Sequence, residues 1–99
     1  MLWYFHMEGR CEGNDEINDP FGFFVHVFIN SKTVDEALEI TLKHLSEEGL
    51  EIVDIRRKGS FDSFTWKNEG LEKKLNKLAK IAEGIEEFPI FSEFQSWKL

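Results

Sequence analysis

Two histidines, His6 and His26, are the residues of this chain whose type and spacing could form a chemical site. His6 lies in a short apolar run at residues 2–8, and His26 lies in a second run at residues 21–30. Residues 9–20 between them are rich in Gly, Asn and Asp, which is typical of a turn or loop. If this loop closes a hairpin, a symmetric register places His6 close to His26.

Metal binding is the first chemistry that such a pair offers. Imidazole nitrogens on neighbouring strands can share a metal ion, with Cys11 or Glu8 completing the ligand set. The sequence has no close-spaced ligand pair such as His-x-x-x-His. A half-buried histidine on an apolar sheet face is usually packed and hydrogen-bonded. We therefore predict no metal and no cofactor.

Acid–base chemistry is the second possibility, with His26 as a general base in a pocket between sheet and helices. An imidazole in that role needs a partner that orients it, and His6, Tyr4 or Asp54 would have to supply the contact. The sequence has no Gly-rich phosphate loop and no Ser-His-Asp pattern. The alternative function that this chemistry supports is a small-molecule-binding protein or a cofactor-free enzyme. Its pocket would be lined by Tyr4, His6, Phe24, His26, Phe28 and Trp66.

The loop at residues 9–20 offers two further readings. Its oxygen-rich side chains could attract calcium, but they lack the twelve-residue spacing of a calcium-binding loop with its central Gly and terminal Glu. The same carboxylates could form an acidic recognition surface together with aromatic groups near the C-terminal end. This predicted partner surface comprises Glu12, Asp15, Glu16, Asp19, Phe91, Phe94 and Trp97.

The elements that must position these side chains follow from apolar periodicity. Residues 21–29 alternate as a strand, yet both of its faces are apolar, so both need cover. One face carries Phe23, Val25, Val27 and Ile29, and the other carries Gly22, Phe24, His26 and Phe28.

Two helices and further strands are expected after this strand. Thr33 and Glu36 form a capping box that begins a helix, and Gly49 is placed to end it. A strand is expected at 50–58, followed by a tight turn at Gly59 and Ser60 into another strand at 60–67. Leucines at helical spacing predict a second helix over about 70–84. In the apolar tail at 88–99, Pro89 permits only an edge or initiating strand.

From residue 21 onward this order is β-α-β-β-α-β, with an extra strand before it. The order resembles the ferredoxin-like α+β sandwich, in which both helices cover one face of an antiparallel sheet. The resemblance implies a bare, aromatic sheet face, which a homodimer or the tail could cover. We predict a homodimer, since two-fold dimers are the commonest oligomers.

A second resemblance concerns Phe21-Gly22-Phe23, which matches part of the signature strand of RNA-recognition-motif domains. Asp19 stands where that signature has a basic residue, and His26 stands where it has an aromatic one. Base stacking also needs a basic surround, and the chain carries a net charge of −7. We predict no nucleic-acid partner.

Composition bounds the remaining possibilities. The 99 residues suit a single α+β domain at 1–99, and a net charge of −7 is compatible with a basic protein partner. With one cysteine, Cys11, and no apolar stretch near the ~20 residues of a membrane span, we expect a cytoplasmic protein without membrane contact. In size, acidity and element order it is similar to small bacterial proteins of mobile gene cassettes, including immunity proteins. Our leading prediction is a small acidic protein-interaction module whose loop at 9–20 and aromatic tail meet a partner, and the small-molecule-binding protein or cofactor-free enzyme is the alternative.

Overall fold

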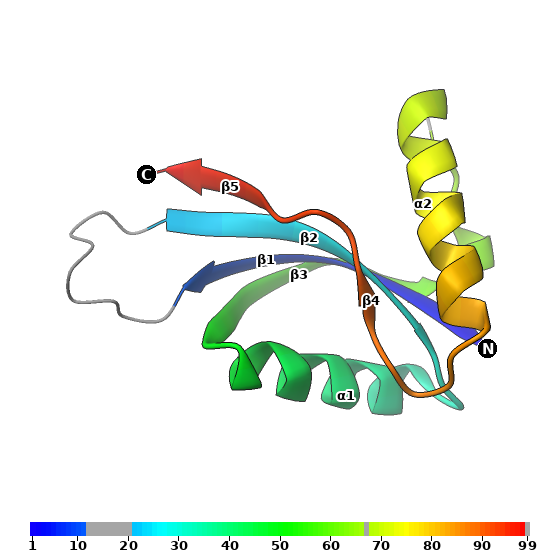
Figure 1. The fold of residues 1–99 in the computed structure, drawn as a ribbon, viewed down its shortest axis with the longest axis horizontal. Coiled ribbons are helices and arrows are strands. Elements are labelled where there is room, and N and C mark those ends of the chain that lie inside the picture. Colours follow the sequence, from blue (N-terminus) through cyan, green and yellow to red (C-terminus); the bar gives the residue numbers. More distant parts are fainter. Residues whose placement is uncertain (12–20, 67, 99) are drawn as a thin grey trace.

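A five-stranded antiparallel sheet forms the centre of the computed structural model, which describes residues 1–11, 21–66 and 68–98. Strand β1 (Leu2–Cys11) lies between β2 (Phe21–Asn30) and β3 (Leu50–Ser60). The far edge of β2 pairs with two short strands, β4 (Ile90–Phe91) and β5 (Gln95–Lys98). The strand order is therefore β3-β1-β2-β4, with β5 also on β2 (Figure 1).

Two helices accompany the sheet, α1 (Val34–Glu47) and α2 (Glu69–Glu83). The predicted cap of α1 is present, because the Thr33 hydroxyl accepts a hydrogen bond from the Glu36 backbone N–H at 3.2 Å. Asn68 caps α2 in the same way by accepting from the Leu71 N–H at 3.1 Å. Gly49, with φ of 75°, lets the chain leave α1 and enter β3.

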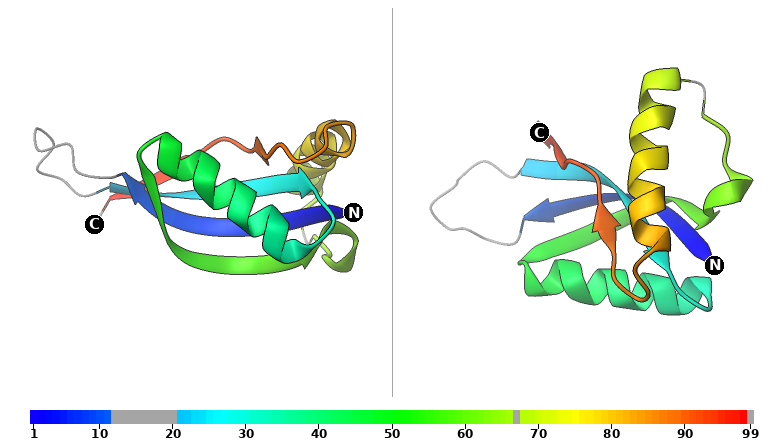
Figure 2. Two further views of the ribbon diagram at one scale, coloured as in Figure 1. Left: turned by 90° about the horizontal axis from the view of Figure 1, so that it is seen from below. Right: turned by 45° about the vertical axis from the view of Figure 1, so that its right-hand side comes forward.

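The two helices pack on opposite faces of the sheet (Figure 2). Ala37 and Leu45 of α1 belong to one core, and Leu75, Ala79 and Ala82 of α2 belong to the other. The alternation predicted for β2 is confirmed. On the α1 side the sheet contributes Phe5, Met7, Phe23, Val25, Val27 and Ile29, and on the α2 side it contributes Tyr4 and Phe28.

The α+β class is therefore confirmed, but the expectation that both helices cover one face is wrong. The strand order also differs from the ferredoxin-like arrangement. The physical reason is the two-sided strand: both Phe28 and its neighbours Val27 and Ile29 are fully buried, so each face receives a helix. Helix α2 covers only one end of its face, and a homodimer that covers the rest stays a prediction.

The strand predicted at 60–67 is also wrong. Strand β3 continues through Gly59, which pairs with Tyr4, and a short 3-10 helix, η1 (Phe61–Ser63), follows it. The Ser63 hydroxyl donates to the Ser60 carbonyl at 2.6 Å and closes this turn. The next residues, 64–66, form no regular element, because Phe64 and Trp66 pack around Tyr4 instead of joining a ladder.

The apolar tail forms the edge of the sheet that Pro89 allows. Phe28 pairs with Ile90, and Val27 pairs with Phe91. The Ser92 hydroxyl then accepts from the His26 N–H at 2.8 Å, and the chain resumes pairing in β5. Among the described residues, neither helix is long and apolar enough to cross a membrane.

Candidate functional site

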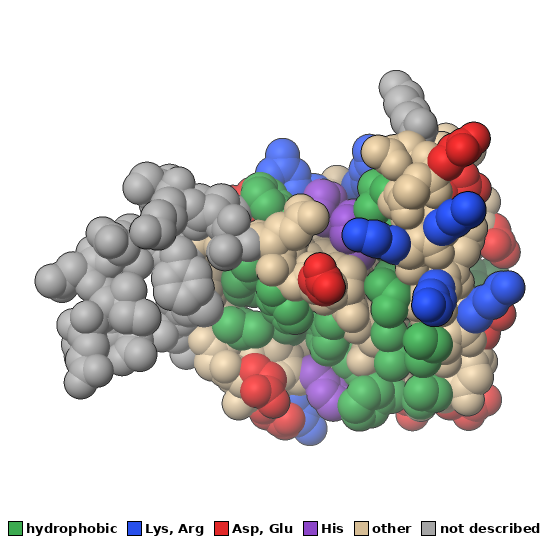
Figure 3. Space-filling model, turned by 45° about the horizontal axis from the view of Figure 1, so that its top comes forward, with side chains coloured by type: hydrophobic (Ala, Val, Ile, Leu, Met, Phe, Trp, Pro, Cys, Tyr) green, Lys and Arg blue, Asp and Glu red, His purple; other side chains and the backbone are tan. Residues whose placement is uncertain are grey.

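A groove of about 860 Å³ opens on the α2 face of the sheet, beside the end that α2 covers. Its floor consists of side chains of β1 and β2, and the segment from β3 into α2 forms one wall. Figure 3 shows histidine side chains at the surface where the sheet meets α2. We call it the histidine groove. Its principal lining residues are Tyr4, His6, Phe24, His26, Arg57 and Trp66.

The two histidines lie side by side in the groove, as the hairpin register predicted. His6 and His26 are direct cross-strand partners in β1 and β2. Their rings are stacked, with centroids 4.4 Å apart and an angle of 9° between the ring planes. A stack this close is easiest to hold when neither ring is charged, because two imidazolium ions would repel each other.

Tyr4 is the orienting partner of His26. The Tyr4 hydroxyl lies 2.5 Å from Nδ1 of His26, and the Tyr4 side chain is fully buried. Burial raises the pKa of Tyr4 well above its ordinary value, an effect that the nearby charge of Arg57 only partly opposes. The phenol therefore stays protonated. Because Nδ1 of His26 is the hydrogen-bond partner that the described residues offer this buried hydroxyl, we assign the phenol as the donor and Nδ1 as the acceptor. The neutral His26 ring then carries its own proton on Nε2.

A cluster of aromatic rings fixes Tyr4 in this position. Trp66 and Phe64 meet its ring edge-on, at centroid distances of 5.1 and 5.0 Å, and Phe28 lies 5.4 Å away. Edge-to-face contacts of this kind stabilise by about 0.5–1.5 kcal/mol each beyond their buried area. They explain why the segment after β3 forms the wall of the groove.

The pKa values of both histidines are lowered. For His26, burial contributes most, followed by the charges of His6 and Arg57, and together they lower the pKa to about 4. For His6, burial again comes first, and Arg56 and Arg57 act in the same direction on its pKa. Both rings are therefore neutral near pH 7, which agrees with their stacking.

This shift predicts a loss of stability in acid. Between pH 6.5, the ordinary pKa of His, and about 4, the unfolded chain binds a proton at residue 26 that the folded chain does not. The free energy of unfolding should therefore fall as the pH falls through this window. Because the ring is only half-buried, we expect about 1–2 kcal/mol from His26.

The measurement is urea unfolding of the wild type and of His26→Gln at several pH values across this window. Gln keeps an acceptor for the Tyr4 hydroxyl but does not titrate. As the pH falls, the free energy of unfolding of the wild type should decrease more than that of His26→Gln. Parallel pH profiles would contradict the shifted pKa.

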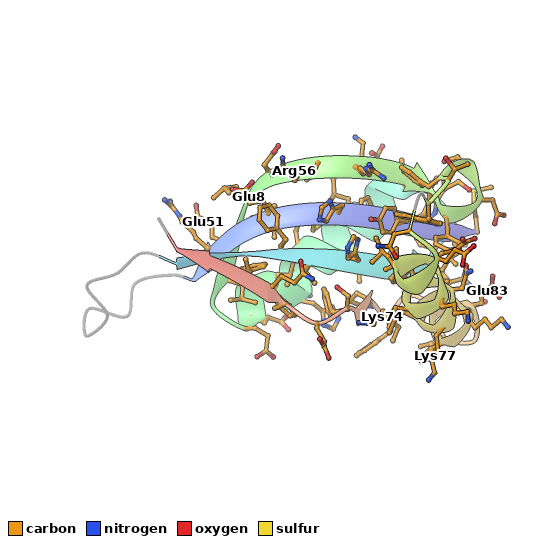
Figure 4. The ribbon with its side chains drawn as sticks, turned by 90° about the horizontal axis from the view of Figure 1, so that it is seen from above. Glu8, Glu51, Arg56, Lys74, Lys77 and Glu83 are labelled. Atoms are coloured by element: carbon orange, nitrogen blue, oxygen red, sulfur yellow. The ribbon has the colours of Figure 1, made fainter. Side chains whose placement is uncertain are left out.

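Two arginines of β3 complete the groove. Arg56 forms an ion pair with Glu8 at 3.0 Å, and its guanidinium lies 5.2 Å from the Phe24 ring centroid. Glu8 and Arg56 are neighbours on adjacent strands in Figure 4. Arg57 is the cross-strand partner of His6, and its guanidinium lies 6.0 Å from the Trp66 ring centroid. Among the described residues, Arg57 has no carboxylate within ion-pair distance.

The structure thus brings five of the six predicted pocket residues together: Tyr4, His6, Phe24, His26 and Trp66. The sixth, Phe28, lies beneath Tyr4 in the core and does not line the groove. The sequence reasoning missed Arg56, Arg57 and Phe64. The sequence shows a basic run at 56–58, but only the β1–β3 register, with Arg57 opposite His6, places its two arginines at the groove.

The predicted partner surface is less complete. Its acidic part lies outside the described residues: Glu12, Asp15, Glu16 and Asp19. The calcium-binding hypothesis concerns the same loop and also falls outside them, as does the side chain of Trp97. Phe91 packs against the α1-side core, whereas Phe94 is 43 % exposed and touches the rings of Phe23 and Phe91.

The chemistry available to the groove is binding by hydrogen-bond donors and aromatic surfaces. Within residues 1–11, 21–66 and 68–98, no three His, Cys, Asp or Glu side chains converge as metal ligands. Neutral His26, with Nδ1 engaged by Tyr4, presents an N–H donor and no free acceptor. Its low pKa makes it a poor base near pH 7.

Comparison of the chain with protein-family models, curated proteins and solved structures gave no match. The fold and the site therefore define a small α+β protein with a histidine- and arginine-lined groove.

Proposed function

We propose that this protein binds a small molecule in the histidine groove. The observation that supports this most is the convergence of three polar side chains, Tyr4, His6 and His26, in a hollow of about 860 Å³ with aromatic walls. Ligand sites are concave, are lined by apolar and aromatic groups and contain a few well-placed polar groups. A surface that serves only a flat protein contact does not need a fixed tyrosine–histidine hydrogen bond.

Catalysis is the weaker form of this proposal. A general base near pH 7 needs an accessible, unprotonated nitrogen with a pKa near that pH. In the histidine groove, Nδ1 of His26 already accepts from Tyr4, and the pKa of His26 is lowered to about 4. Binding therefore fits the groove better than turnover does.

A thermal-shift screen of small metabolites tests the proposal. A ligand at about 100 times its Kd should stabilise the folded protein by about 2.7 kcal/mol, which is a shift of about 10 °C or more for a domain of this size. Trp66→Ala should weaken the binding of that ligand by about tenfold, since one wall of the groove is lost.

Phe88→Ala is the matched control. Phe88 is an exposed aromatic residue that does not line the histidine groove, so its removal should leave the ligand affinity unchanged. A ligand whose affinity responds to Phe88 and not to Trp66 would place the binding site elsewhere and contradict the proposal.

A protein-interaction module is the second candidate function. Phe88 and Phe94, which are 49 % and 43 % exposed, line a separate groove of about 470 Å³ between α1 and the tail. Exposed aromatic residues of this kind are enriched in protein interfaces. The homodimer and a basic protein partner belong to this candidate. It expects a protein partner whose capture is lost in Phe88→Ala and retained in Trp66→Ala.

A further inference from the structure

We infer that the ligand of the histidine groove is a flat ring that carries a negatively charged group, a carboxylate or a phosphate. This inference rests on the proposed function and adds the chemical class of the ligand. Three features of the groove support it: the sign of its charges, the direction of its hydrogen bonds and the placement of its rings.

The charges of the groove have one sign. The chain as a whole carries −7, yet the charged residues that line the groove are Arg56 and Arg57, and no Asp or Glu is among its described lining residues. Glu8 neutralises Arg56 from outside the groove. Arg57 keeps a net positive charge beside both histidines, because within the described chain no carboxylate pairs with it. An anion is the ligand that this charge attracts.

The hydrogen bonds of the groove also favour an anion. Since the Tyr4 hydroxyl donates a hydrogen bond to Nδ1 of His26, the other ring nitrogen, Nε2, carries the proton and is an N–H donor. The Arg57 guanidinium is a donor without any acceptor atom. A carboxylate or phosphate oxygen accepts from both kinds of group, and such charge-assisted bonds are about twice as strong as neutral ones.

The rings favour a flat partner. Arg57 lies 6.0 Å from the Trp66 ring centroid, so the guanidinium and the indole border the same part of the groove. The His6 and His26 rings form a stacked pair at 4.4 Å, with Phe24 6.0 Å from His6. A planar ligand ring can rest on these surfaces while its anionic group reaches Arg57.

Four probes that differ in one property at a time test the inference. Two of them, 2-naphthoate and 2-naphthyl phosphate, have both the flat ring and the negative charge. 2-Naphthamide has the ring without the charge, and octanoate has the charge without the ring. Binding is followed by amide chemical shifts in NMR spectra of the full chain. We expect shifts at groove residues, with at least one naphthalene anion binding about tenfold or more tighter than 2-naphthamide and octanoate.

Arg57→Gln supplies the variant, and Lys58→Gln is its matched control. Both positions are exposed on β3 and both changes remove one positive charge, but Lys58 does not line the groove. Arg57→Gln should weaken the binding of the tighter naphthalene anion by about tenfold and leave the affinity for 2-naphthamide unchanged. Lys58→Gln should change neither of these two affinities. An amide spectrum that is unchanged outside the groove shows that the variant is folded.

Other outcomes would overturn the inference. If 2-naphthamide binds the groove as tightly as the anions, or if Lys58→Gln weakens them as much as Arg57→Gln, the specific role of Arg57 is refuted, and small-molecule binding stands. If octanoate equals the naphthalene anions, the ring requirement is refuted. If neither naphthalene anion shifts groove residues, the ligand class is wrong, and the metabolite screen with Trp66→Ala decides the proposed function separately.

Discussion

Phe28→Ala should lower the free energy of unfolding by about 3–5 kcal/mol, because it removes a fully buried ring from the contact between α2 and the sheet. Helix α2 brings Ala79 and Ala82 to this contact, and such small side chains cannot fill the space that the ring leaves. Phe28 also lies 5.4 Å from Tyr4 and 5.6 Å from Phe61, so the same ring supports the floor of the histidine groove beneath Tyr4.

This loss is large relative to the total stability of a domain, which is commonly about 5–15 kcal/mol. Urea unfolding measures it, and hydrogen exchange locates it. Amides of α2 should lose more protection than amides of α1, because α1 packs on the other face of the sheet. Phe88→Ala, the same change at an exposed site, should cost less than about 1 kcal/mol. Equal losses of protection in both helices would contradict the two-core arrangement.

Gly9→Ala is the second change with a large expected effect, of about 2–3 kcal/mol. A Cβ atom at residue 9 would lie 2.5 Å from Cζ of Phe23 and 2.6 Å from the backbone carbonyl oxygen of Glu51. Phe23 is only 3 % exposed, so its ring has little room to move. The Glu51 oxygen belongs to β3, so relieving that contact requires a shift of the strand.

Gly84→Ala is the control for this effect. Gly84 ends α2 with φ of −82°, and its nearest contact for an added Cβ is the Ile81 carbonyl oxygen at 3.6 Å, which is an ordinary distance. Its replacement should be neutral or stabilise by up to about 1 kcal/mol, since Ala restricts the unfolded chain. Thermal or urea unfolding of both variants gives the comparison. If Gly9→Ala were as stable as Gly84→Ala, β1 and β3 could not approach as closely as the structure places them.

Local sequence patterns predicted the elements that depend on local physics. The cap at Thr33 begins α1, and the leucine spacing matches α2. The alternation from Phe23 to Ile29 gives two apolar faces, one buried throughout and the other fully buried at Phe28 and only partly buried at Phe24 and His26. The cross-strand pairing of His6 with His26 also followed from the sequence, because a symmetric hairpin leaves one simple register. These features need only neighbouring residues and a hairpin.

The aromatic segment after β3 shows where local patterns fail. Phe64 and Trp66 have the two-residue spacing of a strand, yet they leave the sheet because Tyr4 offers them edge-to-face contacts. The face on which α2 packs was also not readable from its periodicity, which defines an apolar stripe but not the surface that the stripe meets.

What the sequence determined by itself was therefore the α+β class, the two-sided β2 strand and the histidine pair. Only the tertiary structure decided that the helices lie on opposite faces and that Arg57 joins the histidines. The physical reason is that both outcomes depend on contacts between residues distant along the chain: Phe28 with α2, and His6 with Arg57 across β1 and β3. Periodicity carries no information about such pairings, which are selected by the packing of the whole domain.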